Sequence, residues 1–326
     1  MKVRALLWSI MLMALGIGAE GARLPQTAAP PQAPESEIKL TPSEIELYKS
    51  AQTLIDWTPS QIQHSPYLHK LRPAGRQDQL PTILDRVGQT VTRMFHNFRN
   101  VSCDEKIVSA AYRYRFHNSS GGNYLPGSHV SRRFRYIIVR RPRGDLPAFA
   151  EYRTDLKGNP IDVTADDTRL QGFFMITWDF ASTFLYLSPA DQHDNRYRYL
   201  GIQTIRNREC HVVGFAQDPE KVQRGNRFYI GSYGVVNLVQ GMAWIDTQTF
   251  QILRVMIWLL APRKDIGLSS QTSTVDFFPV RPSGTDKVLW LPRDVRVEDL
   301  YRGMKVRNIH QYSNYKLFRV ESTIKP

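Results

Sequence analysis

The chain is poor in cysteine and lacks the short motifs that mark metal or nucleophile sites. Only two of its 326 residues are cysteines, Cys103 and Cys210, which excludes a disulfide-rich framework and a cysteine-based zinc site. No HExxH, CxxC or GxSxG segment occurs, and the eight histidines are scattered along the chain. We therefore expect a protein that is not an enzyme and has no metal or other cofactor.

The two cysteines allow two interpretations. In an oxidising compartment Cys103 and Cys210 could form one disulfide, which would close a loop of about 100 residues and stabilise the fold by roughly 4 to 5 kcal/mol in the chain-entropy model. The alternative is two separate buried thiols. Cys210 precedes His211 in a predicted strand, where neighbouring side chains point to opposite faces, so these two residues do not form a thiolate–imidazole pair.

Acidic residues are fewer than basic ones, 30 against 43, and the full chain carries a net charge of +13. A long uncharged apolar run occurs only at the N-terminus, where Lys2 and Arg4 precede residues 5–19 and a small-x-small site follows. This run is shorter than the roughly 20 residues of a membrane-spanning helix. Residues 1–21 therefore match a secretory signal peptide, with an uncleaved anchor as the alternative. We expect a secreted or periplasmic protein.

Removal of the signal peptide leaves 41 basic and 29 acidic residues, a net charge of +12. Export makes nucleic acid a poor partner, so this charge favours anionic phospholipid head groups or other acidic envelope surfaces. A basic surface that only maintains solubility is the alternative. Arginines gather around Phe134 and Tyr136 in one predicted strand, whose exposed face we interpret as a contact for an anionic membrane surface. The candidates are Arg132, Arg133, Arg135, Arg140 and Arg141.

Composition and periodicity divide the mature chain into three segments. Residues 22–40 are rich in proline and alanine, which predicts a disordered linker. Residues 41–79 contain two helix-start signals, at Thr41 and Thr58, and are predicted to form a preface of short helices. In residues 80–326 one long amphipathic helix is followed by segments with the two-residue period of strands, which indicates a single β-rich domain.

The stretch from residue 240 to 262 predicts the central hairpin of this domain. Its second strand is apolar on both faces, and a strand of that kind is expected between two apolar layers or between a packed helix and a ligand cavity. Strict alternation places Phe250, Ile252, Met256, Trp258 and Leu260 on one face and Leu253, Val255, Ile257 and Leu259 on the other.

A second apolar segment, residues 172–187, has helical spacing over most of its circumference and is therefore predicted to be a buried helix. About ten or eleven antiparallel strands surround these helices in the sequence pattern. The predicted fold class is α+β, mainly antiparallel β.

The order of elements resembles the periplasmic lipoprotein-carrier superfamily. The resemblance covers about residues 80 to 320, and the full chain looks most like uncharacterised secreted bacterial proteins of that fold. Its parts are the helix Leu80 to Phe98, the Leu-Ser-Pro end of the apolar helix at Leu187 to Pro189, the hairpin Tyr199 to Phe215, Ala243-Trp244-Ile245-Asp246 and Ile252-Leu253-Arg254. The resemblance implies a curved sheet or unclosed β-barrel wrapped around helices, with an apolar cavity between sheet and helices that accepts acyl chains.

Large adaptable side chains of the kind that line acyl-chain cavities are the candidate ligand contacts. They are Trp178, Phe180, Phe184, Trp244, Met256 and Trp258. The leading hypothesis is a secreted, non-enzymatic binding protein that holds a lipid or an acylated partner between the sheet and the apolar helix. The alternative is an envelope protein-interaction or sensing module in which the same residues form a filled core.

Overall fold

A computed structural model describes residues 38–98, 100–117, 121–140, 148–161, 170, 180–223, 225–230 and 233–318. The predicted signal peptide and nearly all of the predicted linker lie outside these ranges. Within them, no helix combines the length and the hydrophobicity needed to cross a membrane.

The preface consists of short helices that begin at the residues expected from the sequence. Helix α1 (Pro42–Lys49) and helix α2 (Pro59–Gln63) each start with a proline behind a threonine cap. In both, the threonine hydroxyl accepts a hydrogen bond from the third helical residue, whose side chain bonds back to the threonine backbone. The 3-10 helix η1 (Leu54–Asp56) lies between them, and helix α3 (Leu80–Asn97) follows the two-residue strand β1 (Arg72–Pro73).

The rest of the described chain is mainly strand. The strands are β2 (Val101–His117), β3 (Gly121–Arg140), β4 (Phe149–Thr154), β5 (Asn195–Ile205), β6 (Arg208–Gln217), β7 (Asn226–Ile230), β8 (Tyr233–Asn237), β9 (Val239–Asp246), β10 (Ile252–Leu259), β11 (Leu268–Val280), β12 (Leu289–Tyr301) and β13 (Met304–Leu317). Three further 3-10 helices are η3 (Ala181–Leu187), η4 (Gln192–Asp194) and η5 (Lys264–Ile266).

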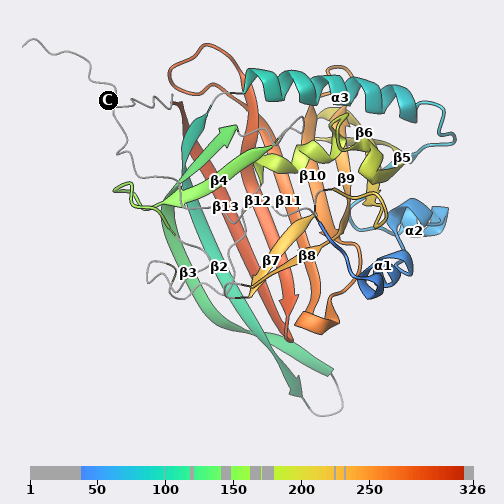
Figure 1. Ribbon diagram of the computed structural model, residues 1–326, viewed down its shortest axis with the longest axis horizontal. Helices are drawn as coiled ribbons and strands as arrows, with labels where there is room; N and C mark the ends of the chain where they lie inside the picture. Colours follow the sequence, from blue (N-terminus) through green and yellow to red (C-terminus); the bar gives the residue numbers. More distant parts are fainter. Residues whose placement is uncertain are drawn as a thin grey trace, which may run out of the picture.

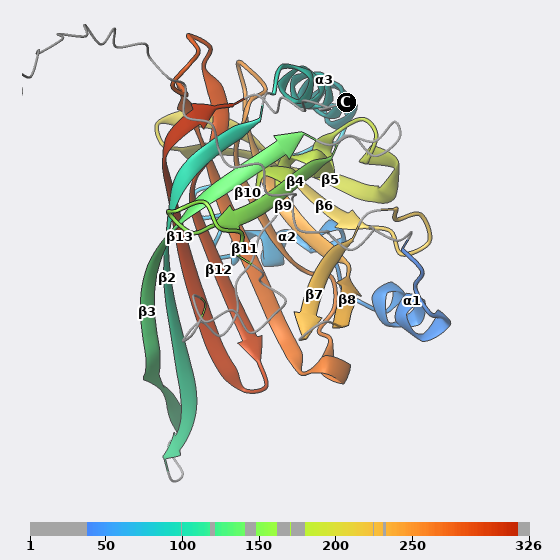
Figure 2. The same ribbon diagram turned by 60° about the vertical axis from the view of Figure 1, so that its left-hand side comes forward.

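Eleven strands form one antiparallel sheet in the order β1-β5-β6-β9-β10-β11-β12-β13-β2-β3-β4, and β7 pairs with β8 in a separate ribbon. Among the described residues the two edge strands, β1 and β4, do not pair with each other, so the sheet is unclosed. In both ribbon views β4 passes in front of strands from the middle of the sheet, as a curved sheet requires (Figures 1 and 2). The predicted fold class is confirmed.

Helix α3 crosses one end of the sheet, while the hairpin β2–β3 extends far beyond the opposite end (Figure 1). The apolar face of α3, including Ile83, Val87 and Val91, packs with η3 against one face of the sheet. We call this the inner face. The preface residues Leu54 and Ile62 pack against the other side of β6, β9 and β10, which we call the outer face.

The hairpin β9–β10 therefore lies between two apolar layers, as its doubly apolar pattern predicts. The face assignment along β10 differs from strict alternation, because the register shifts between Ile252 and Arg254. This β-bulge puts Ile252 on the inner face with Val255 and Ile257, whereas Leu253 and Met256 face outward. One extra residue at the bulge reverses the parity of every side chain beyond it.

Candidate functional site

The centre of the inner face is filled by η3, the described part of the predicted apolar helix. Residues 171–179, and Trp178 with them, lie outside the described residues. Phe184 is buried, with its ring 5.7 Å from the Phe149 ring and 6.0 Å from the Phe277 ring. The Tyr186 ring stacks on Phe215 at 5.1 Å. The segment is thus an apolar plug on the sheet, and we call Phe180 to Leu187 the plug.

A buried carboxylate anchors the N-terminal end of the plug. Glu151 on β4 accepts hydrogen bonds from the backbone N–H groups of Ala181 and Ser182, at 3.1 and 3.0 Å, and from the Ser182 hydroxyl at 3.0 Å. The Tyr136 hydroxyl donates to the same carboxylate. Burial raises the pKa of Glu151, and these hydrogen bonds oppose the rise. The plug is therefore tied to the sheet edge through one side chain.

A buried ion pair lies beside this anchor. Arg153 donates to Glu105 from Nε at 2.5 Å and from Nη2 at 2.7 Å. Glu105 also bonds to His310 Nδ1 and accepts from the Tyr312 hydroxyl, both at 2.9 Å. Burial alone would raise the pKa of Glu105, but the charge of Arg153 and the hydrogen bonds outweigh it and lower the pKa to about 2. A carboxylate with this many hydrogen-bond partners has a structural role. We call Glu105, Arg153, His310 and Tyr312 the clamp.

The clamp was not anticipated from the sequence, although a signal for it exists. Glu105 stands two residues from Cys103 and from Ile107 in a strand, so it shares their buried face. A carboxylate in such a position needs a buried cation, and Arg153 supplies it from β4. Which arginine would do so depends on strand order, which sequence spacing does not reveal.

The structure does not bring together the five cavity candidates that it describes. Phe180 and Phe184 lie on the inner face, whereas Trp244, Met256 and Trp258 lie on the outer face beneath the preface. Trp244 Nε1 donates to Gln203 Oε1 at 2.7 Å, and the Trp258 ring stacks on Trp57 at 6.3 Å. The outer three are therefore packing residues, and only the inner pair belongs to a candidate ligand site.

The two cysteines are free thiols on opposite faces of the sheet. Cys103 packs in the inner core and Cys210 in the outer one, and five strands separate β6 from β2 in the sheet order. The disulfide considered from the sequence is not formed, and the arrangement is the alternative of two buried thiols. Burial raises the pKa of both thiols, that of Cys210 to about 12, so neither is a reactive thiolate.

The arginines of β3 do not form one surface. Arg132 and Arg133 are both exposed, but as neighbours in a strand they point to opposite faces. Arg135 is half-buried, with Nη2 3.9 Å from Asp104. Arg140 donates to the His96 carbonyl at 3.1 Å near the end of α3, which is a helix-terminating contact, and Arg141 lies outside the described residues.

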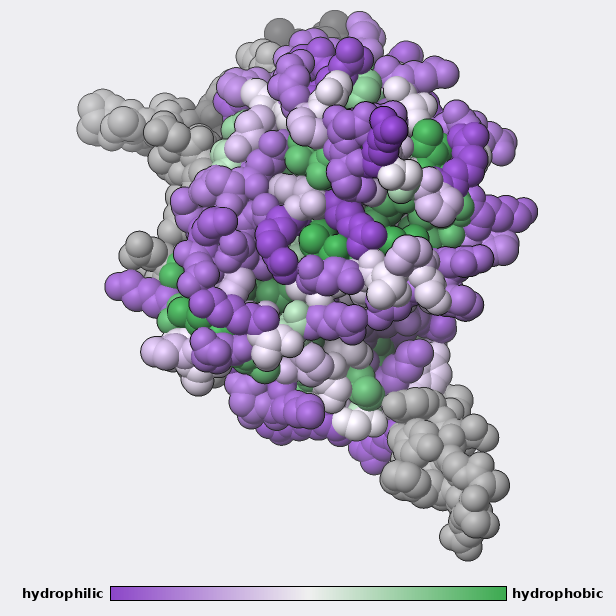
Figure 3. Space-filling model, turned by 90° about the vertical axis from the view of Figure 1, so that its right-hand side faces the viewer, coloured by the Kyte–Doolittle hydropathy of each residue, from purple (hydrophilic) through white to green (hydrophobic). Residues whose placement is uncertain are grey.

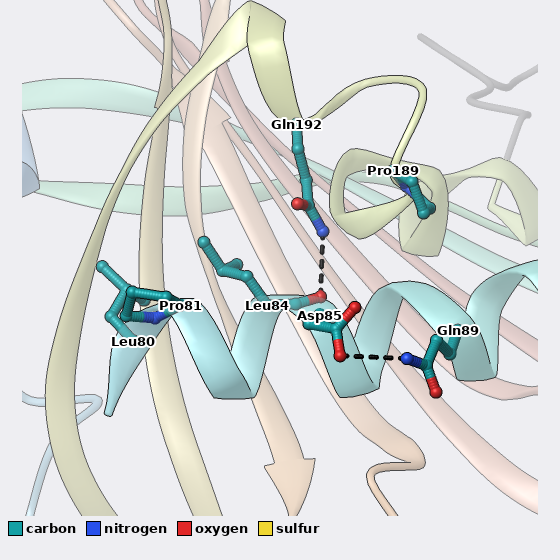
Figure 4. A pocket seen from close by; sticks show the side chains of 7 residues that line it. All are labelled: Leu80, Pro81, Leu84, Asp85, Gln89, Pro189 and Gln192. Atoms are coloured by element: carbon teal, nitrogen blue, oxygen red, sulfur yellow. Dashed lines mark hydrogen bonds between the residues drawn. The ribbon is translucent and has the colours of Figure 1, made fainter. Parts of the chain in front are cut away.

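A shallow surface pocket of about 420 Å³ lies between the start of α3 and the turn after η3. Gln192 Nε2 crosses it to donate to the Leu84 carbonyl at 3.0 Å, and Gln89 donates to Asp85 at 2.9 Å (Figure 4). These contacts join α3 to the chain leaving the plug. The face of the molecule that carries α1 and α2 is mostly hydrophilic, with small hydrophobic patches separated by polar residues (Figure 3). No cluster of three or more potential metal ligands occurs in the described part of the chain.

No protein-family model matches the chain, and no curated protein matches its sequence. Among solved structures it is similar to a DUF1329 family protein from Desulfovibrio piger, with 11% identity and a TM-score of 0.36 over 74% of this chain and 94% of that one. It is also similar to a putative outer membrane lipoprotein-sorting protein domain from Vibrio parahaemolyticus, with 10% identity and a TM-score of 0.32 over 72% and 91%. At these TM-scores neither structure informs the function of this chain.

Proposed function

We propose that this protein is a secreted, non-enzymatic binding protein that holds a lipid or an acyl chain against the inner face of its sheet, in the place of the plug. The observation that carries the proposal is the plug itself, a seven-residue 3-10 helix buried on the inner face of an unclosed sheet. Helices of this type are rarely long and are weakly stabilised by their own hydrogen bonds.

The plug can exchange with an acyl chain at little cost in hydrophobic burial. Phe184 and Tyr186 cover the rings of Phe149, Phe215 and Phe277. A chain of methylene groups against the same rings would keep that apolar surface away from water. The exchange would break the Glu151 anchor and the hydrogen bond of 3.0 Å between the Tyr186 hydroxyl and Asn226.

A second candidate is an envelope protein-interaction or sensing module. The observation in its favour is that the described inner face is packed, with Phe180 and Phe184 at 1% and 2% exposure. In that case the plug is a permanent part of the core, and the protein acts through its surface.

Native mass spectrometry followed by organic extraction, on protein purified from its own envelope without detergent, tests the binding function. We expect a mass excess that extracts as phospholipid or fatty acid. If the measured mass is that of the polypeptide alone, and does not change after incubation with lipid vesicles, the binding function is overturned and the interaction module is favoured.

The variant Glu151→Gln tests the role of the plug. Replacing the buried carboxylate weakens hydrogen bonds to two backbone amides, by about 1–3 kcal/mol in total, so the open state becomes more populated and lipid uptake should rise about tenfold or more. The control is Glu209→Gln, whose side chain is 55% exposed. Equal uptake by both variants, with circular dichroism showing both folded, would mean that ligand binding does not displace the plug.

A further inference from the structure

The inner face contains two buried hydrogen-bond acceptors that have no partner among the described residues. Asp299 on β12 is 2% exposed and His310 on β13 is fully buried. Both carboxylate oxygens of Asp299 and the Nε2 atom of His310 lack a hydrogen bond within the part of the chain that the structure describes. Such groups are rare in folded proteins and call for an explanation such as a bound water or ligand.

Strand register shows that these acceptors share the inner face. His310 stands opposite Val295, and Asp299 follows Val295 and Val297 at the two-residue period in an unbroken ladder. Val295 and Val297 belong to the inner core. Asp299 and His310 therefore point to the same side of the sheet as the plug.

Further buried polar residues surround them on four adjacent strands. On β12, Val297 pairs with Asn308 of β13 on one side and with Ser273 of β11 on the other. Asn308 in turn pairs with Ser109 of β2. Ser109, Ser273 and Asn308 are 3%, 5% and 0% exposed. We call Ser109, Ser273, Asp299, Asn308 and His310 the inner polar lane. An apolar core has no need of such a lane, because each buried polar group is costly unless it is hydrogen-bonded.

The hydrogen bond between Glu105 and His310 makes the Nε2 atom of His310 an acceptor. Glu105 is ionised, so Nδ1 of His310 must carry the proton that makes their hydrogen bond. Burial lowers the pKa of His310, against the opposing effect of Glu105, and the ring is therefore neutral at pH 7. In a neutral imidazole with a protonated Nδ1, the Nε2 atom has only a lone pair to offer.

Asp299 is the stronger of the two acceptors. Burial raises its pKa to about 7. The side chain of Gln271, its partner on β11, opposes this rise, and the negative charge of Glu298 adds to it. Near neutral pH the carboxyl is therefore easily ionised by a cation, which would lower its pKa and release a proton. An anionic group would be repelled by the ionised Asp299 carboxylate.

We propose that the inner polar lane binds the primary ammonium group of an amphiphile at Asp299, while the apolar part of the ligand lies on the inner face. This inference rests on the proposed binding function and names the head group that the site selects. An ammonium offers three donors and a positive charge, which match a buried carboxylate that forms no salt bridge among the described residues. His310 lies four residues along the neighbouring strand from the position opposite Asp299, about 13 Å away, so it would serve a second donor of the ligand.

Three probes with the same chain and different head groups test the proposal. Decylamine, decan-1-ol and decanoate are titrated into the full-length mature protein by isothermal calorimetry at pH 7.5. We expect decylamine to bind at least about tenfold more tightly than decan-1-ol, and decanoate to bind most weakly. In two buffers of different ionisation enthalpy, decylamine binding should release a fraction of a proton that decan-1-ol binding does not release.

The variant Asp299→Asn should bind all three probes with similar affinity, since it keeps the shape and removes the negative charge. The matched control is Asp294→Asn on the same strand, where the side chain is 42% exposed and paired with Arg293, and it should keep the preference for the amine. A measurement on the unaltered protein avoids dependence on the variant: at pH 5, where Asp299 is protonated, the preference should fall.

The outcomes separate this inference from the binding function. If decylamine binds no better than decan-1-ol, or if its advantage survives in Asp299→Asn, the assignment of the ammonium to Asp299 is overturned while lipid binding stands. If none of the three probes binds and purified protein also carries no lipid, both proposals fall.

Discussion

At the scale of single residues, the clamp illustrates how charge is accommodated inside the sheet. Glu105 and Arg153 are both almost fully buried, and desolvation of two charges is offset only because each finds several partners. The Arg153 guanidinium also lies 4.9 Å from the centre of the Tyr136 ring. Through Tyr136 the clamp connects to Glu151, and through Glu151 to the plug, so its geometry bears on the proposed ligand site.

Replacing Glu105 by Gln should destabilise the protein by about 3–5 kcal/mol, because it leaves Arg153 as a buried charge without its counter-ion. Urea unfolding at pH 7, followed by circular dichroism, measures the difference. The matched control is Asp104→Asn, the neighbouring residue on the same strand. Its side chain is 45% exposed and lies 3.9 Å from Arg135, so we expect a loss of no more than about 1 kcal/mol. Equal losses in the two variants would contradict the role assigned to the clamp.

At the scale of elements, the preface is an integral part of the fold. Leu54 of η1 is fully buried against β6, and its aliphatic side chain occupies the space above Gly214. Its backbone N–H also donates to Gln240 Oε1 at 2.8 Å. A deletion of residues 22 to 79 would therefore uncover the outer core around Trp244 and Met256. Single substitutions at the contact are a cleaner probe of the preface than truncation.

The variant Gly214→Ala should destabilise the protein by about 1–3 kcal/mol, as overpacking of a filled core does. A Cβ at this position would lie 2.1 Å from Leu54 Cδ1, so η1 must move away from the sheet. Gly75→Ala is the control, because a Cβ there meets no atom within 4 Å. Urea midpoints of the two variants give the comparison. A neutral Gly214→Ala would show that the preface adjusts without loss, and that its contact with β6 contributes little.

At the scale of the whole molecule, the basic surface is expected to bring the mature protein to anionic membranes. Residues 22–326 carry a net charge of +12, so binding of this part of the chain to phosphatidylglycerol vesicles should weaken steeply between 50 and 500 mM salt. The double variant Arg132→Gln with Arg133→Gln should weaken binding at low salt about as much as Arg76→Gln with Lys264→Gln, which removes two exposed charges elsewhere, because Arg132 and Arg133 point to opposite faces of the sheet. Co-sedimentation with vesicles measures both. A clearly larger loss for the Arg132 and Arg133 pair would contradict attraction by net charge and mark these two residues as a membrane contact.

Much of the architecture follows from local pattern. The 3.6-residue period from Leu80 onward predicts α3, the capping boxes predict α1 and α2, and the two-residue period predicts the antiparallel strands. The unclosed sheet was expected only from the resemblance to the lipoprotein-carrier superfamily. These features depend on neighbours within a few residues, which sequence displays directly. The doubly apolar strand at residues 252–259 likewise predicts two apolar layers, because both of its faces must leave water.

The functional surface could not be obtained in the same way. The bulge after Ile252 puts Met256 and Trp258 on the face opposite to Ile252, whereas strict alternation placed all three on one face. Only the folded sheet shows that Met256 and Trp258 lie on the side of the preface while Phe184 lies in the inner core. The meeting of Glu105 with Arg153 and His310, and the placement of Asp299 beside Asn308, depend on strands β2, β4, β12 and β13 becoming neighbours. Net charge and strand content were thus determined by the sequence itself, because they are sums or short-range patterns. The partners of each buried polar group were decided by tertiary structure, because strand order and a one-residue register shift have no local signature.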